Sequence, residues 1–171
     1  MDAAHVETFR SSLVGAATLH ETTATETAET LDALVSGLTI GTPLPFEDAT
    51  LPDGVETDFT PADIEAAETG ITPARHAIAD YGTVTIPADE AGRELVALYP
   101  STHIIVLAAS DIAPDMATAY DRLDWDITAE SGERVTTQVL ATGSSATADM
   151  GTLIQGVHGP SDVHIVLLED C

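Results

Sequence analysis

The segment from Gln138 to Leu168 constrains the fold more than any other part of the sequence. Two apolar runs, Val135 to Ala141 and Val163 to Leu168, are separated by a Gly/Ser loop and by apolar residues at helical spacing from Met150 to Ile154. Strand, loop, helix, turn and strand in this order predict a βαβ unit, whose strands are parallel and joined by a right-handed crossover. Both faces of the second run are apolar, which is typical of a strand that helices cover on both sides.

Other apolar runs extend this pattern into an α/β fold. His103 to Ala108 predicts a buried strand, and Thr83 to Pro87 predicts a shorter one. A helix is expected after Asp111, and strands that alternate with helices predict a mainly parallel sheet with helices on both faces. We expect His103 to Ala108, Val135 to Ala141 and Val163 to Leu168 to belong to this sheet.

The first third of the chain has a different pattern. Apolar residues at helical spacing predict a helix from Ala3 to about Gly15, with Val6, Phe9, Leu13 and Val14 on its apolar face. A short strand is expected from Ala17 to Glu21, followed by a second helix that ends at Gly37. The N-terminal pair of helices should pack against the sheet.

A proline-rich segment from Gly41 to Asp58 predicts a surface connection. The sequence Thr60-Pro61-Ala62-Asp63 that follows predicts the start of a helix, because it combines an N-cap residue, a proline at the first helical position and an acid at the third. We expect this helix to end at Gly70.

The charge of the chain indicates the kind of solution in which the protein is stable. The chain has 29 acidic and 5 basic residues, no lysine, and a formal net charge of −24. Such charge destabilises a compact chain by self-repulsion, and molar salt screens it by reducing the Debye length to about 3 Å. An acidic disordered chain is the alternative, but 44% of the residues are hydrophobic, which favours a packed core. We therefore expect a halophilic protein.

The same composition excludes several function classes. Five scattered arginines cannot supply the clustered cations that nucleic acids and anionic membrane surfaces require. The sequence has neither an apolar run of about 20 residues nor a basic segment followed by an apolar one at its start, so we expect a cytoplasmic location. At 171 residues a single domain is expected.

Cysteine chemistry is also restricted. Cys171 is the only cysteine, whereas a zinc or iron–sulfur centre takes about four such ligands. We therefore expect no metal and no cofactor, and any redox chemistry associated with this protein is assigned to a partner.

Two motifs carry a family resemblance. The blocks Thr142 to Asp149 and Gly156 to Ile165 resemble the C-terminal signature of the LUD domain, the LutC/YkgG lactate-utilisation family. Weaker similarity extends through Leu98 to Val106, Ala77 to Val84 and Thr60 to Asp63, so that it covers about residues 60–170. The acidic composition suggests a haloarchaeal type of member.

The resemblance implies a fold and two classes of function. The LUD domain is similar to the NagB/RpiA/CoA-transferase-like fold, with residues 1–40 as an N-terminal helical part, 41–58 as a connection and 59–170 as the LUD core. LutC-type proteins are accessory proteins in the oxidation of L-lactate to pyruvate, with iron–sulfur partner proteins, and no catalytic activity of their own is expected. The alternative is an enzyme that binds a small anion, a CoA ester or a sugar phosphate.

The Gly/Ser loop is the first candidate for ligand binding. If it opens a helix, backbone N–H groups from Gly143 onward can hold an anion, and Ser144, Ser145 and Thr147 can add hydroxyl donors. The alternative is that Ser145 or Thr147 only caps the helix, which Asp149 favours by its own charge. Ala146 stands where family members commonly carry a basic residue, which removes an anion contact.

The turn Gly156 to Pro160 is the second candidate, and with the Gly/Ser loop it should enclose a pocket. His158 can act there as an acid or base or can lock the turn, and Gly159 belongs to the same turn. Gly82 and Thr83 place flexible backbone near the start of a strand, where ligands bind in some α/β proteins, or form a simple turn.

The remaining histidines and Arg93 have simpler interpretations. We interpret His103 and His164 as hydrogen-bonded residues of buried strands. Arg93 is interpreted as an ion-pair partner in preference to a substrate ligand. No catalytic residue is predicted.

Overall fold

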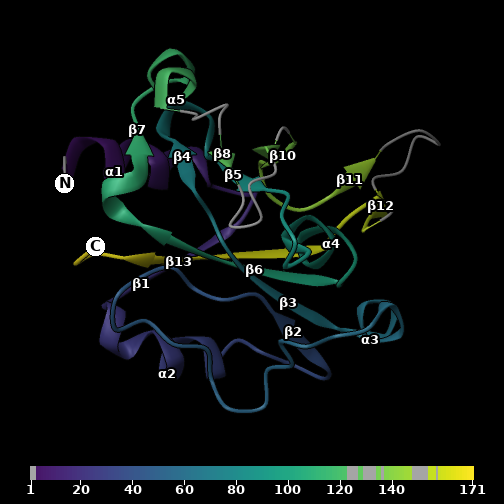
Figure 1. Cartoon of the computed structure of the whole chain (residues 1–171). Coiled ribbons are helices and arrows are strands. Elements are labelled where there is room, and N and C mark those ends of the chain that lie inside the picture. Colours follow the sequence, from purple (N-terminus) through teal and green to yellow (C-terminus); the bar gives the residue numbers. More distant parts are fainter. Residues whose placement is uncertain (1–2, 123–126, 129–133, 136, 148–153, 157) are drawn as a thin grey trace.

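The computed structural model describes residues 3–122, 127–128, 134–135, 137–147, 154–156 and 158–171 (Figure 1). Its centre is a sheet of five strands, and every neighbouring pair in it is parallel. In spatial order the strands are β1 (Thr18–Thr22), β13 (Asp162–Leu168), β6 (Thr102–Ala108), β3 (Thr69–Pro73) and β2 (Thr39–Gly41). The predicted α/β fold with a mainly parallel sheet is confirmed, and β13 is an internal strand, as its two apolar faces indicated.

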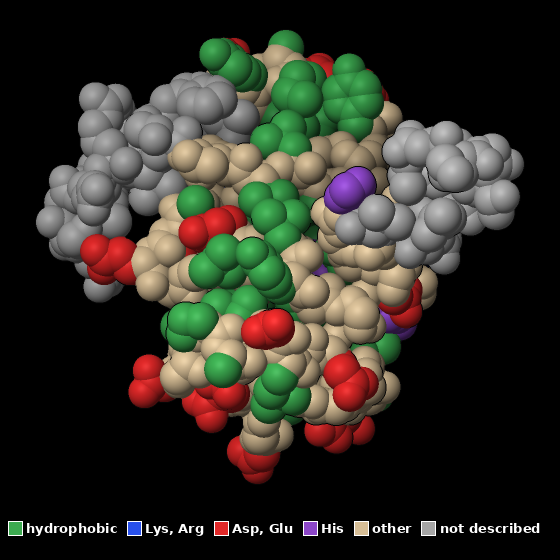
Figure 2. All heavy atoms as spheres, turned by 90° about the vertical axis from the view of Figure 1, so that its right-hand side faces the viewer, with side chains coloured by type: hydrophobic (Ala, Val, Ile, Leu, Met, Phe, Trp, Pro, Cys, Tyr) green, Lys and Arg blue, Asp and Glu red, His purple; other side chains and the backbone are tan. Residues whose placement is uncertain are grey.

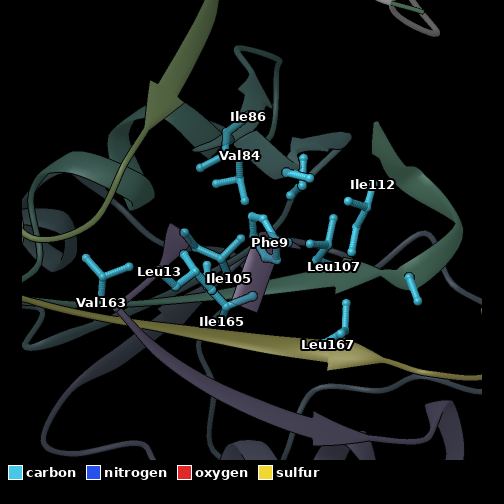
Figure 3. Packing of buried hydrophobic residues seen from close by; sticks show 14 of the residues in the cluster. Phe9, Leu13, Val84, Ile86, Ile105, Leu107, Ile112, Val163, Ile165 and Leu167 are labelled. Carbon is cyan, nitrogen blue, oxygen red and sulfur yellow. The ribbon is translucent and has the colours of Figure 1, made fainter. Parts of the chain in front are cut away.

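Helices lie on both faces of this sheet. α1 (Ala3–Ser12) covers one face, where its Phe9 is fully buried. Figure 3 shows Phe9 between residues of β6 and β13 on one side and Val84 and Ile86 on the other. On the opposite face, the 3₁₀ turn η1 (Ala24–Glu26) and α2 (Thr27–Asp32) contribute Ala24 and Leu31 to a second buried cluster. Alternate residues of β6 enter the two clusters, as expected of a strand covered on both sides.

A second, smaller sheet lies on the α1 side of the central sheet (Figure 1). Its strands, in spatial order, are β10 (Gln138–Ala141), β5 (Thr83–Pro87), β4 (His76–Ile78) and β7 (Ile112–Ala113). β5 runs antiparallel to both of its neighbours, whereas β4 and β7 are parallel.

Two chain segments connect the sheets at the same place. β3 continues through Ala74 and Arg75 into β4, and β6 continues through the 3₁₀ turn η3 (Ala109–Asp111) into β7. Since β3 and β6 are neighbours in one sheet and β4 and β7 are neighbours in the other, the sheets diverge just beyond the carboxyl ends of β3 and β6.

The predicted βαβ unit is wrong. β10 lies in the small sheet, antiparallel to β5, and has no pairing with β13. Between them, β11 (Ala146–Thr147) and β12 (Ile154–Gln155) pair as an antiparallel hairpin, so Ile154 belongs to a strand and not to a helix. Met150 and Leu153 lie outside the described residues. An apolar run does not specify its partner strand, and the side chain of Leu140 is 51% exposed, which is typical of a strand that is covered on one face only.

The helix predicted from Thr60 begins as expected and ends early. α3 (Pro61–Ala66) has a complete capping box in which Thr60 N donates to Asp63 Oδ2 at 2.8 Å. Gly70 lies inside β3 and does not end the helix. A Cβ atom at Gly70 would lie 2.3 Å from the carbonyl oxygen of Val96 in α4 (Arg93–Leu98). The glycine therefore marks a close approach of strand and helix, which only the packed structure reveals.

Two further expectations need correction. Val14 is 84% exposed and does not belong to the apolar face of the first helix, because α1 ends at Ser12. The segment from Gly41 to Asp58 is more than a surface connection: four of its apolar side chains pack against the cluster on the α2 side of the sheet. These are Leu44, Phe46, Leu51 and Val55.

The remaining elements are short. They are η2 (Ala79–Tyr81), α5 (Met116–Arg122) and the antiparallel pair β8 (Ile127–Thr128) and β9 (Arg134–Val135). None of the helices within the described ranges is long and apolar enough to cross a membrane.

Candidate functional site

The Gly/Ser loop and the Gly156 to Pro160 turn are joined through a single residue, Ser145. Its backbone N–H donates to the carbonyl of Pro160 at 2.8 Å, and its own carbonyl accepts from Gly156 N at 2.9 Å. Its side-chain oxygen accepts from His158 N at 3.3 Å. The Gly/Ser loop and the turn, one from each motif of the family signature, therefore form one local unit, in which Ser145 and His158 are 13 residues apart in the chain.

Gly143 packs this unit against Ala16, in the segment between α1 and β1. Its φ of +96° lies in the left-handed region, and a Cβ atom would lie 2.4 Å from the carbonyl oxygen of Ala16. The next residue, Ser144, donates its N–H to the same carbonyl at 2.9 Å. Glycine is required here both by conformation and by space.

Four of the predicted ligand residues line one cavity of about 160 Å³: Gly143, Ser145, His158 and Gly159. β10 and the last turn of α4 supply its apolar wall, with Leu98 and Leu140. His103 and Val163 place the cavity near the amino ends of β6 and β13, whereas ligands of α/β sheets usually bind beyond the carboxyl ends.

The other four predicted residues do not line this cavity. Ser144 lines a different one of about 530 Å³, between the chain that follows α1 and the start of β13. Thr83 reaches the site only through a contact of 2.7 Å between its Oγ1 and that of Thr142. Gly82 has a φ of +60° and packs against the backbone of Ser12. Thr147 belongs to β11.

The structure does not form the anion site that was expected at a helix N-terminus. Residues Ala146 and Thr147 continue the loop as a strand, so no helix begins at Gly143 to Ser145. The hydroxyl of Ser145 accepts a hydrogen bond from the Gly156 to Pro160 turn, and, because the chain continues as a strand, Ser145 does not cap a helix as the alternative expected. Ligand binding by the eight residues named from the sequence therefore stays a prediction.

His103 on the floor of this cavity is a neutral core residue. It is 1% exposed, and its Nε2 lies 2.9 Å from Thr72 Oγ1 in the neighbouring strand. Burial lowers the pKa of His103 to about 3. The interpretation as a hydrogen-bonded sheet histidine is confirmed.

Exposed apolar side chains lie at the smaller cavity and beside it. Leu98 of α4 and Leu140 of β10 line the cavity and are 42% and 51% exposed, and Leu95 of α4 and Tyr99, which follows α4, are 37% and 65% exposed. Figure 2 shows the face on which α3 and α4 lie, with hydrophobic side chains running through its middle and Asp and Glu along its lower margin. Contiguous exposed apolar surface is typical of interaction sites.

A larger cavity, of about 600 Å³, was not predicted from the sequence. It lies where the two sheets diverge, and its lining includes Arg75, His76, Arg93 and Asp111. Arg75 and His76 follow β3, whose first two residues, Thr69 and Gly70, were predicted as the end of a helix. The sequence therefore did not indicate that these two residues lie beyond the end of a strand. The scarcity of arginine in the chain was the only feature that pointed to Arg75.

Within the described ranges, no group of three or more His, Cys, Asp or Glu residues is placed to hold a metal ion.

The geometry defines a class of protein: an α/β protein with a five-stranded parallel sheet, a small mixed sheet on one face, and a signature loop and turn joined through Ser145. The family model of the LUD domain matches residues 10–168. The chain belongs to the LUD domain family.

Individual relatives agree with this assignment. The chain is 35% identical to lactate utilization protein C of Bacillus velezensis over 108 residues, which are 62% of the chain and 44% of that protein. It is 30% identical to lactate utilization protein B of Bacillus subtilis over 105 residues, or 61% of the chain and 20% of that protein. The matched segment thus spans less than half of these relatives.

A solved structure has the same fold. The crystal structure of a DUF162 family protein from Deinococcus radiodurans superimposes with a TM-score of 0.70 over 98% of both chains, at 21% sequence identity. The likeness therefore includes the N-terminal elements, for which the sequence resemblance had given no evidence.

Proposed function

We propose that this protein serves lactate utilisation as a LutC-like accessory protein that acts with iron–sulfur partner subunits in the oxidation of L-lactate to pyruvate. The observation that carries the proposal is the similarity to proteins named lactate utilization protein C, together with the family match over residues 10–168. Similarity to a lactate utilization protein B supports a system in which related domains occur in more than one component.

The cysteine content supports a division of labour. Oxidation of lactate removes two electrons, which an iron–sulfur chain can accept, and such clusters are held by about four thiolates. The sequence has one cysteine, Cys171, and burial raises the pKa of its thiol above the ordinary value, which disfavours the thiolate that binds metals. The redox centre is therefore assigned to the partner.

The apolar patch around the smaller cavity is the surface we assign to that partner. Leu98 and Leu140 line the cavity mouth and are half exposed. A Leu140→Ser variant should weaken the complex, and Val14→Ser, at an exposed apolar position outside the patch, is the matched control. Equal retention of the partner by both variants in a pull-down would remove this surface from the proposal.

Growth on lactate tests the proposed role directly. Deletion of the gene should abolish or slow growth on L-lactate as the carbon source and leave growth on pyruvate unchanged. The purified chain should show no lactate dehydrogenase activity and contain no iron, whereas the complex should show both. Normal growth of the deletion strain on lactate would refute the proposal.

A second candidate function, an enzyme that binds a small anion, is favoured by one observation. The larger cavity is lined by two of the five arginines of the chain.

A further inference from the structure

The cavity between the two sheets has the position and size of a ligand site. Much of its lining comes from the last residues of β3 and β6 and from the residues that follow β3, β6 and β13. These are Pro73, Ala74 and Arg75, then Ala108, Ser110 and Asp111, and finally Cys171. In α/β sheets, ligands bind in the crevice outside the carboxyl ends of the strands. A volume of about 600 Å³ lies within the range of small-molecule sites.

Cations gather here although they are scarce in the chain. Arg75 and Arg93 line the cavity, and Arg122 lies close enough to influence the charges of His76 and Asp111. Arg75 is exposed, and its guanidinium makes no ion pair or hydrogen bond with any residue in the described part of the chain. In a protein with 29 carboxylates, a free guanidinium at a cavity is unusual.

Arg93 retains donors for a ligand. Its Nε lies 3.1 Å from Asp89 Oδ2. A guanidinium has five N–H donors in a planar fork, so this ion pair orients the side chain and leaves the remaining donors available to the cavity.

His76 contributes two ring nitrogens. Both are buried, and neither makes a hydrogen bond of ordinary length and angle to a described residue, although the backbone of Arg122 lies close enough to raise the pKa of the ring. Burial is the main cause that lowers the pKa of His76, so the ring is neutral and offers one donor and one acceptor. Buried polar atoms without partners are rare in native structures, and a polar ligand would satisfy them.

Two acidic side chains also line the cavity, those of Glu47 and Asp111. Glu47 is exposed and can turn toward water. Burial raises the pKa of Asp111, an effect that the nearby His76, Arg75 and Arg122 oppose. Asp111 thus lies among cations, which compensate for its charge.

We propose that this cavity binds a small organic anion, a carboxylate or a phosphate ester, through the guanidinium groups of Arg75 and Arg93 and the imidazole of His76. The inference does not rest on the lactate role, because it uses only the position, volume and chemistry of the cavity. It places the ligand at the carboxyl ends of the strands, away from Ser145 and His158.

Calorimetric titration at constant molar KCl tests the proposal in two arms. One arm uses L-lactate, pyruvate and citrate, and the other uses inorganic phosphate and glucose 6-phosphate, with glucose as the neutral control. Saturable binding in one arm is expected, and the arm that binds assigns the anionic group. The affinity should fall about tenfold or more in Arg75→Gln, because a charge-assisted contact is lost.

Arg10→Gln is the matched control, since it makes the same change of charge at an arginine that pairs with Glu7 and Glu21 on α1 and β1. Retained binding in Arg10→Gln and weakened binding in Arg75→Gln support the site. Three results would overturn it: no saturable binding in either arm, unchanged binding in Arg75→Gln, or an equal loss in both variants. None of these outcomes depends on growth on lactate, so this test and the test of the proposed function can fail separately.

Discussion

The imidazole rings of His20 and His164 connect two neighbouring parallel strands, β1 and β13, with 3.0 Å between Nε2 of the first and Nδ1 of the second. The other nitrogen of His164 lies 3.2 Å from Asp162 Oδ2. One ring must donate and the other accept, so the contact requires at least one neutral ring. Burial and, secondly, repulsion by His164 lower the pKa of His20. The pair resists double protonation.

Stability should fall on mild acidification. His103 has a folded-state pKa of about 3, below the unfolded value of about 6.5. The unfolded chain therefore binds the proton first, and stability falls as the pH drops below about 6.5, by up to about 1.4 kcal/mol per pH unit. His20 and His76, whose pKa values are also lowered, add in the same direction.

Urea unfolding of the protein at pH 7.5 and pH 5.5, in constant molar KCl, measures this loss. The His103→Gln variant, which keeps a polar group beside Thr72, should be less stable at pH 7.5 but show a flatter dependence on pH. An unchanged pH slope in His103→Gln would show that His103 is not the neutral buried group described above.

Salt should stabilise the protein strongly. At a net charge of −24, lowering the salt from molar to about 0.1 M lengthens the Debye length from about 3 Å to about 10 Å, so repulsion among carboxylates is no longer screened. We expect the melting temperature to fall during stepwise dialysis from molar KCl, as followed by circular dichroism. A melting temperature that is independent of salt would contradict a halophilic origin.

Replacement of Gly143 should separate backbone conformation from steric contact. Gly143→Ala places a Cβ atom 2.4 Å from the carbonyl oxygen of Ala16, whereas Gly15→Ala, at a φ of +79°, meets no atom within 4 Å. Both variants bear the cost of the left-handed conformation, about 1–2 kcal/mol, but only Gly143→Ala must also move the backbone. The free energies of unfolding from urea titrations should therefore differ, and equal values would refute the close packing of the loop against Ala16.

Ser145 and His158 can be tested as parts of one unit. Ser145→Ala removes the acceptor of His158 N and should cost about 1 kcal/mol of stability. His158→Ala leaves that backbone contact in place and should cost less, because His158 is exposed. Stability is measured by urea unfolding and function by growth on lactate.

If these residues contact a ligand or partner, His158→Ala should impair growth on lactate while the protein stays folded. If both variants only destabilise the protein and growth is normal, the two motifs serve the turn and not a binding site.

The sequence predicted structure correctly where the stabilising contacts join residues that are close together in the chain. The capping box at Thr60 and Asp63 forms as predicted because both partners lie within one helical turn. The two-faced apolar run from Val163 to Leu168 is an internal strand because only burial on both sides can cover it. By contrast, the partner strand predicted for β10 was wrong. β10 pairs with β5, which lies more than fifty residues away in the chain, and local sequence does not specify such a contact.

The same distinction between local and long-range contacts applies to the candidate site. The sequence indicated the Gly/Ser loop and the Gly156 to Pro160 turn, and the structure joined them through Ser145. The larger cavity was not predicted, because Gly70 indicated the end of a helix where the structure has β3, the strand before Arg75. Arg93 lines the same cavity from a separate helix, α4, and the sequence did not indicate that the two arginines lie near each other.

The sequence by itself determined the α/β class, the acidic composition, the single cysteine and the family resemblance, since these follow from composition, periodicity and short motifs. Only the tertiary structure decided which strands are neighbours, which glycines are needed for close approach, and where the arginines meet. Those features arise from long-range packing, in which the free energy of a residue depends on partners that the local sequence does not contain.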